Sequence, residues 1–441
     1  MPGSARASVA GSPGLGDPYF PLAGNGGYDV AHYSLELDYE RAGNQLAGVA
    51  VITATATQSL SRFDLDLRGF EISRLTVNGE PAAFARDGQE LIVTPRHALR
   101  DGRPFVVRVR YAGHPTEVVD PDRSRAGWIL TPDGAFVANE PQGSPGWYPA
   151  NDDPRDMATY DMAITVPEGI TAIGNGRLVS SRTQHGKTTW RWMEDAPMAS
   201  YLATATNGVF ELRTTFAGGL PLYHAVDPAE VSHGAFDRLD AEAKIIDFFS
   251  ALYGPYPFSS GGGVVDHAPE VGYELESQTR AQYDETPTPT TVVHEIAHQW
   301  FGDAVALTAW PDIWLNEGFA RFSEWIYDER HGGRTAQQRF EALYARNTSD
   351  PLWSCPPASL GGPGFIFTEP PYGRGAMTLQ ALRAKVGDDA FFALLRQWYA
   401  RNRYGNVTTA DFVALAKEIT GQQLDAFFDA WLRQPGKPAS W

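Results

Sequence analysis

The spacing of apolar residues changes near the middle of this 441-residue chain, and the change restricts the fold more than any other feature. Between residues 28 and 212, short runs alternate apolar and polar residues, which is the pattern of half-buried strands. The run HYSLELDYE directs one set of side chains to one face of a sheet: Tyr33, Leu35, Leu37 and Tyr39. Asn78-Gly79 and His185-Gly186 supply two-residue turns between such runs. The first half therefore predicts an antiparallel β-saddle or sandwich.

From about residue 213 to 441 the spacing becomes helical. In FDRLDAEAKIIDFFSALYG, four apolar residues share one helix face: Leu239, Ala243, Ile246 and Phe249. Near the end, Thr408 and Asp411 have the spacing of a capping box. Because the chain is too long for one ordinary core, we expect an α+β, multidomain protein with a β domain over 28–212 and a mainly helical domain over 213–441.

Composition excludes some functions and leaves the compartment open. The net charge of −17 and the pI near 5.0 disfavour binding to nucleic acid or to an anionic membrane. No run of apolar residues is long enough to span a bilayer. Residues 1–27 form a Gly/Ala/Ser/Pro-rich lead, which we expect to be flexible and typical of an exported protein whose signal peptide is absent from this sequence. The alternative is the frayed terminus of a cytoplasmic protein.

The sharpest motif is HEIAHQWFGD, which begins at His294. On a helix that Thr290 or Thr291 would cap, the four-residue spacing places His294 and His298 on one face, as two metal ligands require. Glu295 follows His294 and can reach a metal-activated water without being a ligand itself. The motif therefore predicts a metal-dependent hydrolase, with two ordinary surface histidines as the alternative.

A second helix supplies the third ligand. Eighteen residues separate His298 from Glu317, which lies one turn into DIWLNEGFARFSEWIYDERHGG, a helix that we expect Asp312 to cap. Two histidines and one glutamate form the donor set of a catalytic zinc with one open position. Phe301 stands where a third-histidine motif would have glycine, and no third histidine follows. We therefore predict one Zn²⁺ on His294, His298 and Glu317.

HEIAHQWFGD, the 18-residue gap and WLNEGFA together resemble the aminopeptidase N and leukotriene hydrolase family of zinc metallopeptidases, the gluzincins. The resemblance covers nearly the whole chain and implies a β-saddle domain followed by a thermolysin-like zinc domain over 213–441. It also implies that the large C-terminal helical domain of longer relatives is missing, so we expect a more open active site.

Family motifs outside the zinc helices assign further residues. The family's Gly-x-Met-Glu-Asn strand matches the segment that begins at Tyr273, so Glu276 resembles the glutamate that binds the free α-amine of the substrate. Within that segment, Tyr273 replaces the family's glycine and Glu274 replaces a small residue. Glu140, which precedes Pro141, resembles a second amine-binding carboxylate from the β domain.

Tyr372 lies in Tyr-Gly-Arg-Gly-Ala, which resembles the family segment whose tyrosine donates a hydrogen bond to the tetrahedral oxyanion. A buried structural tyrosine is the alternative for this residue. With Glu295 as general base, the resemblance implies a zinc metallo-aminopeptidase acting on peptide or aminoacyl substrates with a free N-terminus.

Two other functions stay open. One is a specialised hydrolase of a dipeptide or of a modified amino-acid amide, motivated by Tyr273 and Glu274. The other is a non-catalytic peptide-binding relative. The sequence does not indicate the oligomeric state or the side-chain preference.

Overall fold

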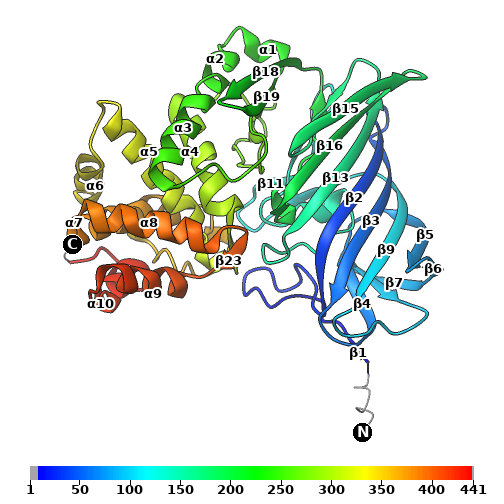
Figure 1. Cartoon of the computed structure of the whole chain (residues 1–441), viewed down its shortest axis with the longest axis horizontal. Helices are drawn as coiled ribbons and strands as arrows, with labels where there is room; N and C mark the ends of the chain where they lie inside the picture. The colour runs from blue at the N-terminus through cyan, green and yellow to red at the C-terminus, as the bar shows by residue number, and fades with distance from the viewer. Residues whose placement is uncertain (1–7, 440–441) are drawn as a thin grey trace.

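The computed structural model describes residues 8–439, which form a β-rich body beside a helical one (Figure 1). The β-rich body contains a large sheet and two smaller sheets. The strands of the large sheet are, in spatial order, β15 (Arg177–Gln184), β16 (Lys187–Met198), β13 (Ala158–Pro167), β2 (Tyr28–Glu40), β3 (Gln45–Ala56), β9 (Pro104–Gly113), β5 (Glu71–Val77) and β6 (Glu80–Pro81). The smaller sheets are β1 (Val9–Ala10), β4 (Leu60–Asp66), β8 (Glu90–Thr94) and β7 (Ala83–Asp87), and β10 (Glu117–Val119), β11 (Arg125–Leu130), β12 (Ala135–Ala138), β17 (Asn207–Gly208) and β14 (Thr171–Ala172).

Alternation along the strands builds the core of this body, as the sequence predicts. In β2 the four apolar side chains of one face are all buried: Tyr33, Leu35, Leu37 and Tyr39. Both expected turns are present, and each uses two residues with positive φ. Asn78 and Gly79 have φ of 51° and 82°, and His185 and Gly186 have φ of 53° and 74°. These backbone conformations match the right-handed twist of the strands that the turns connect.

One feature of the large sheet differs from the prediction of an antiparallel structure. β2 and β13 run parallel, with Tyr160 opposite Tyr33 and Ile164 opposite Leu37. More than one hundred residues separate these two strands, and they include β4 and β8 of one smaller sheet and β11 and β12 of the other. No tight hairpin therefore fixes the relative direction of β2 and β13. A parallel pair needs only a long connection, which this chain provides.

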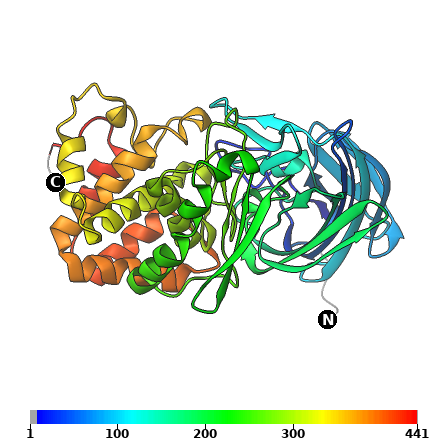
Figure 2. The ribbon, with the colours of Figure 1, turned by 90° about the horizontal axis from the view of Figure 1, so that it is seen from above.

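The second body begins with a four-stranded sheet and continues as packed helices, which occupy the end of the molecule opposite the sheets (Figure 2). Its strands are β18 (Glu211–Ala217), β19 (Leu220–Val226), β20 (Gly263–Val265) and β21 (Ala281–Tyr283), with a separate pair of β22 (Val305–Leu307) and β23 (Gly405–Val407). Its helices are α1 (Pro228–Val231), α2 (Ala235–Leu239), α3 (Glu242–Tyr253), α4 (Pro289–His298), α5 (Trp314–Arg330), α6 (Ala336–Tyr344), α7 (Gly375–Val386), α8 (Asp388–Asn402), α9 (Thr409–Thr420) and α10 (Asp425–Phe428).

The helix ends follow local chemistry. Thr408 caps α9 by accepting a hydrogen bond from the backbone N–H of Asp411, and the Asp411 side chain accepts from the backbone of Thr408, so the predicted capping box is confirmed. Gly421 ends α9 in the left-handed conformation. The helix expected from Phe236 onward is instead divided into α2 and α3. Asp240 and Ala241 keep helical backbone angles, but the N–H of Ala241 bonds to the carbonyl three residues earlier, at Arg238, in place of the α-helical partner.

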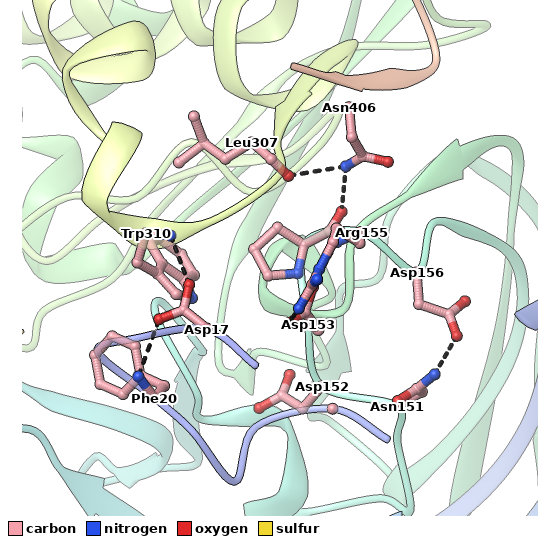
Figure 3. Close-up of polar contacts among 12 residues, drawn as sticks. Asp17, Phe20, Asn151, Asp152, Asp153, Arg155, Asp156, Leu307, Trp310 and Asn406 are labelled. Carbon is pink, nitrogen blue, oxygen red and sulfur yellow. Dashed lines mark hydrogen bonds and ion pairs between the residues drawn. The ribbon is translucent and has the colours of Figure 1, made fainter. Parts of the chain in front are cut away.

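The N-terminal lead was expected to be flexible, yet residues 8–27 have many fixed contacts. β1 pairs with β4, and Asp17 binds both its own segment and the helical body. Its carboxylate accepts hydrogen bonds from the backbone N–H groups of Phe20 and Trp310 at 3.0 and 2.8 Å (Figure 3). Residues 1–7 of the lead lie outside the described residues.

A second contact between the two bodies lies close by. The Asn406 side-chain amide donates to the carbonyl of Pro154 at 2.8 Å and to that of Leu307 at 2.9 Å (Figure 3). Asp17 and Asn406 thus tie the loop segments of the β-rich body to the helical body. The domain boundary predicted between residues 212 and 213 falls inside β18, which pairs with β19 in the helical body's sheet. Within residues 8–439, no helix has the length and apolarity needed to cross a membrane.

Candidate metal centre and active site

Helix α4 presents the two histidines of the sequence motif. Thr288 caps this helix by accepting a hydrogen bond from the backbone N–H of Thr291 at 3.1 Å. The prediction that Thr290 or Thr291 is the cap is therefore wrong by two or three residues. Pro289 explains the earlier start, because a proline has no N–H to leave unsatisfied and its fixed φ suits the first helical position.

The imidazoles of His294 and His298 point one nitrogen each at Glu317. The distances from Nε2 to Glu317 Oε2 are 3.2 Å for His294 and 3.5 Å for His298. The other nitrogen, Nδ1, faces an acceptor in both rings: Glu324 Oε1 at 2.7 Å and the carbonyl oxygen of Phe301 at 3.0 Å. An acceptor at Nδ1 holds the proton there and leaves the Nε2 lone pair free for a metal.

The three predicted ligands therefore converge, and their donor atoms lie within 4.8 Å of one another. Burial alone would raise the pKa of Glu317, but the neighbouring imidazoles lower it to about 2. Burial alone would lower the pKa of His294, but Glu317 and Glu324 raise it to about 9. The carboxylate of Glu317 is therefore ionised beside protonated imidazoles, and a divalent cation that binds the same three donors displaces the imidazole protons. Two imidazoles and a carboxylate fit Zn²⁺.

Helix α5 supplies Glu317 in its first turn. Asp312 does not cap this helix as predicted. It lies in a short 3₁₀ turn (Trp310–Asp312) and accepts a hydrogen bond from the Thr409 hydroxyl at 2.5 Å. The 3₁₀ turn continues directly into the helix and satisfies the first N–H groups, so no side-chain cap is needed.

Glu295 lies beside the metal donors and is buried. Its carboxylate, that of Glu276 and a ring nitrogen of His298 lie within 4.8 Å of one another. Burial raises the pKa of Glu295 to about 8, although His294 and His298 oppose the increase. A divalent cation on the three donors would lower this pKa again. The buried position of Glu295 beside the three donors suits a group that accepts a proton from water.

The two carboxylates assigned to amine binding meet in the same space. Glu140 follows β12 in the β-rich body, whereas Glu276 precedes β21 in the helical body. Oxygens of Glu140, Glu276 and Glu317 lie within 4.8 Å of one another. Within the described residues, neither Glu140 Oε1 nor Glu276 Oε1 has a hydrogen-bond donor. Burial, followed by the charge of Glu276, raises the pKa of Glu140 well above its usual range.

The segment expected to be a substrate strand is only partly extended. Leu275 exchanges two backbone hydrogen bonds with Gln282 at 2.9 and 2.8 Å, and the chain then turns at Thr279, which has a φ of 65°. Gln299 holds the turn, because its amide donates to the Glu276 carbonyl at 3.1 Å and accepts from the Thr279 N–H at 2.8 Å. Sequence reasoning missed this role of Gln299, which follows His298 directly.

Tyr372 lies in the turn before α7 (Gly375–Val386), with its ring stacked on that of His294 at a centroid distance of 6.0 Å. The Arg321 guanidinium carbon is 5.7 Å from the centre of the tyrosine ring. Burial, followed by the charges of Glu317 and Glu140, raises the pKa of Tyr372 well above its usual range. The phenol therefore keeps its proton, and its hydroxyl makes no hydrogen bond with another residue in the range 8–439. It is available to a ligand.

For Glu324 on α5, the sequence favours an ordinary helix-surface charge over a contact with a zinc ligand, and the structure shows that this interpretation is wrong. Glu324 is 6% exposed and accepts from His294 Nδ1. The sequence did contain a signal, because Glu324 follows Glu317 by seven residues, which is two helical turns and therefore the same face.

These residues line one cavity of about 570 Å³ between the two bodies. Glu140, Asp122 and Ser124 come from the β-rich body, and helices α4 and α5 with Tyr372 form the opposite wall. Tyr273 closes one side, because its hydroxyl donates to the carbonyl of Arg125 at 2.5 Å. The cavity has room for several residues of a peptide.

Comparison with known proteins agrees with this geometry. The Peptidase M1 N-terminal domain matches residues 30–202, and the Peptidase family M1 domain matches residues 273–431. The solved structure of the M1 zinc metallopeptidase from Deinococcus radiodurans has a TM-score of 0.86 and 30% identity, and the match covers 97% of this chain and 99% of that chain. This chain belongs to peptidase family M1.

A variant of the same Deinococcus enzyme, bound to a Tyr-Ser-Ala substrate, gives a TM-score of 0.86 with 30% identity over 96% of this chain and 99% of that one. Among curated relatives, probable aminopeptidase 1 of Sulfurisphaera tokodaii is 23% identical over 440 residues, which are 93% of this chain and 53% of the relative. Aminopeptidase N of Lactococcus lactis is 26% identical over 341 residues, which are 66% of this chain and 38% of the relative. The chain thus spans about half the length of these curated relatives, or less.

Proposed function

We propose that this chain is a zinc-dependent aminopeptidase that removes the N-terminal residue from peptides. The observation that carries the proposal is the placement of two buried carboxylates, Glu140 and Glu276, within 4.8 Å of the metal donor Glu317. Two carboxylates without hydrogen-bond donors attract an ammonium group, which a peptide offers at its N-terminus. Because the amine site adjoins the metal donors, the first peptide bond of the substrate is the one that reaches them.

One zinc ion per chain, held by His294, His298 and Glu317, would polarise the scissile carbonyl and make a water more acidic. Glu295 accepts the proton of the attacking water and passes it to the leaving amine, which its buried position beside the donors allows. Tyr372 donates its phenolic hydrogen to the oxyanion that develops on the substrate carbonyl. Glu324 and the Phe301 carbonyl keep the two imidazoles in the orientation that leaves Nε2 free.

The test is hydrolysis of a panel of aminoacyl amides and short peptides by the zinc-loaded protein, each with its N-acetylated counterpart. We expect cleavage of the free-amine substrates alone. Glu295→Gln should keep bound zinc, measured by elemental analysis, and lose about 10²–10⁴-fold in kcat. Equal cleavage of acetylated substrates would contradict the role of Glu140 and Glu276, and zinc binding without any cleavage would favour a non-catalytic peptide-binding relative.

One observation favours a second candidate, a specialised hydrolase of dipeptides or modified amino-acid amides. Tyr273 stands where the family has glycine, and its hydrogen bond to the Arg125 carbonyl closes one side of the cavity. If the closure limits substrate length, Tyr273→Gly should increase kcat/KM for tripeptides relative to dipeptides. An unchanged ratio would leave the general aminopeptidase as the better assignment.

A further inference from the structure

Three aspartates outside the catalytic cavity converge at the boundary between the two bodies. Carboxylate oxygens of Asp133, Asp227 and Asp266 lie within 4.8 Å of one another. Asp133 belongs to the connection between β11 and β12 in the β-rich body, whereas Asp227 and Asp266 belong to the helical body. No residue of this group takes part in the proposed peptidase chemistry.

Strand register brings two of the three together. β19 and β20 run parallel with Val226 opposite Val265, and Asp227 and Asp266 are the residues that follow these strands. The N–H of Asp227 donates to the Val265 carbonyl at 2.8 Å, so the two side chains leave the sheet at the same edge. In parallel sheets, the carboxyl ends of neighbouring strands are a common place for ligand sites.

Backbone N–H groups hold each carboxylate in place. Asp133 Oδ2 accepts from the N–H of Val209 at 2.6 Å, and Asp227 Oδ1 accepts from that of Ala229 at 2.6 Å. Asp266 Oδ1 accepts from the N–H of His267 at 2.8 Å. These bonds hold the three carboxylates in an arrangement in which one oxygen of each lies within 4.8 Å of the others.

Asp266 is the decisive member, because it is 1% exposed and its Oδ2 has no hydrogen-bond donor among the described residues. Within residues 8–439, no Lys or Arg nitrogen forms an ion pair of 4.0 Å or less with any of the three carboxylates. The imidazole of His267 is bound to Glu230 through its Nδ1 at 2.7 Å, and burial raises the pKa of Asp227 more than the charge of His267 lowers it. Burial, followed by the charges of Asp133 and Asp227, raises the pKa of Asp266 to about 7. A buried, donor-free carboxylate beside two others calls for a positive charge.

We propose that Asp133, Asp227 and Asp266 form a binding site for a calcium-type divalent cation that fastens the β-rich body to the helical body. The donors are carboxylate oxygens, with no sulfur and no imidazole, which is the ligand set of hard cations. Oxygens around Ca²⁺ lie about 2.3–2.6 Å from the ion, so opposite ligands are separated by roughly 4.6–5.2 Å. One oxygen from each of the three carboxylates lies within 4.8 Å of the others, which such a sphere allows, and water would supply the remaining ligands.

The site differs in chemistry from the catalytic centre, where two imidazoles select zinc. A cation here binds the folded protein and not the unfolded chain, so it stabilises the native state. It also bridges the β11–β12 connection and the strand ends of the helical body, which together frame one side of the domain boundary. Its loss should therefore lower stability without removing zinc or any group that contacts a substrate.

The test is calcium binding by the full chain, purified, stripped of loosely bound metal and reloaded with stoichiometric zinc. Calcium chloride is then titrated, with magnesium chloride in parallel, and bound calcium is measured by elemental analysis after gel filtration. We expect one calcium per chain, a dissociation constant on the order of 10–100 µM, and an increase in Tm of about 3–6 °C at millimolar calcium. Magnesium should produce a smaller shift, because it dehydrates reluctantly and prefers a tighter octahedral site.

Variants separate this site from non-specific ion effects. Asp133→Asn and Asp227→Asn keep the side-chain shape and should lose the calcium-dependent shift, whereas Asp237→Asn, an exposed aspartate on α2, should keep it. Zinc content and peptide hydrolysis at 25 °C are measured in the same samples, so a failed peptidase assay does not affect the calcium result.

The proposal is overturned if the wild-type protein binds no calcium, or if Asp133→Asn shows the same calcium shift as the wild type. It is also overturned if Asp266→Asn raises Tm while the wild type does not respond to calcium. That result would mean that shared protons, and not a metal ion, relieve the repulsion within the cluster.

Discussion

Glu140 and Glu276 are the residues that most distinguish this cavity from an ordinary metal site. Both are nearly inaccessible to solvent, and each has an oxygen without a hydrogen-bond donor among the described residues. An unsatisfied buried polar group costs about 1–3 kcal/mol, and a charged one costs more. Such an arrangement lowers the stability of the free protein, and under the proposed function it becomes favourable when a substrate ammonium group enters. Function and stability therefore oppose each other at these two positions.

Replacing Glu276 should separate these two effects. Glu276→Gln keeps the shape but removes one charge, so we expect kcat/KM for free-amine substrates to fall by roughly 10²-fold, mainly through KM. Tm should rise at the same time, because repulsion from Glu140 and Glu317 is relieved. Steady-state kinetics and thermal unfolding measure the two quantities. Glu285→Gln, an exposed substitution nearby, is the control, and an unchanged KM in Glu276→Gln would contradict amine binding.

Glu324 offers a second prediction at the scale of a single residue. Its carboxylate holds the proton on His294 Nδ1 at 2.7 Å, so Glu324→Gln should weaken control of the ring tautomer. We expect zinc affinity to fall about 10–100-fold. Zinc retention in competition with a chelator measures this directly, independently of turnover. Glu341→Gln, on the exposed side of α6, should retain zinc as the wild type does, and equal retention by Glu324→Gln would show that its contact is not needed.

At this scale, spacing along one helix predicts that His294 and His298 share a face, and the motif on the next helix supplies Glu317. His294, His298 and Glu317 meet as expected. Glu140, Glu276 and Tyr372 were assigned through the family resemblance and not through spacing. Gln299 could not be assigned, since its partners, Glu276 and Thr279, are brought to it only by the turn of a distant segment. Contacts between segments far apart in the chain are the part that spacing does not encode.

The packing of α5 against α7 places Tyr372 beside the metal donors. A Cβ added to Gly318 on α5 would lie 2.9 Å from Cα of Gly375, the first residue of α7, and a Cβ added to Gly375 would lie 2.9 Å from Cα of Gly318. The two backbones touch at this point, and no side chain fits between them. Tyr372 is three residues before Gly375, so the close approach sets the distance between the phenol and Glu317, which directly precedes Gly318.

Gly318→Ala should therefore force α5 and α7 apart. Because both contacts are with backbone atoms, neither neighbour can move aside as a flexible side chain would. We expect the free energy of unfolding to fall by about 1–3 kcal/mol and kcat to fall as Tyr372 is displaced. Urea unfolding and steady-state kinetics measure these changes. Gly219→Ala is the matched control, since a Cβ there meets no atom within 4 Å, and equal stability of the two variants would contradict the close packing.

Element boundaries were less predictable than element types. The helices that carry the ligands exist as expected, but α4 begins at Pro289, and the segment Gln299–Asp303 after it contains a kink at Phe301 and Gly302. That kink turns the Phe301 carbonyl toward His298 Nδ1. A motif that reads as one continuous helix in the sequence is thus interrupted three residues after its second histidine, where Phe301 leaves helical angles and Gly302 has a φ of 133°.

At the scale of the whole molecule, the two bodies depend on each other through polar contacts that the sequence does not reveal. The switch from strand to helix periodicity predicts two domains, and the family motifs predict a site between them. The pattern of residues 8–27 does not indicate that Asp17 binds Trp310. The sequence around Asn406 likewise does not indicate that this side chain binds the Pro154 carbonyl (Figure 3). Loop-to-loop contacts of this kind have no periodicity, and they become visible only in the folded chain.

A buried aspartate in the β-rich body predicts how the free energy of unfolding changes with pH. Asp66, at the end of β4, is fully buried and accepts hydrogen bonds from the N–H groups of Gly24 and Asp152. Burial nevertheless raises its pKa to about 7. In the unfolded chain the pKa is about 3.9. Between these values the folded state binds the extra proton, so the free energy of unfolding decreases as pH rises through this range.

The contribution of Asp66 should fall by about 2–3 kcal/mol between pH 5 and pH 8. Denaturant unfolding of the wild type and of Asp66→Asn at both pH values measures it, because asparagine does not ionise; the difference also contains the effect of the Asp66 charge on the pKa of Glu90 and Asp152. Relative to the variant, the wild type should lose stability toward pH 8. Asp101→Asn, which is exposed, should follow the wild type. If the wild type and Asp66→Asn have the same pH dependence, the Asp66 carboxyl is already ionised at pH 5, and the N–H groups of Gly24 and Asp152 then outweigh the cost of burying its charge.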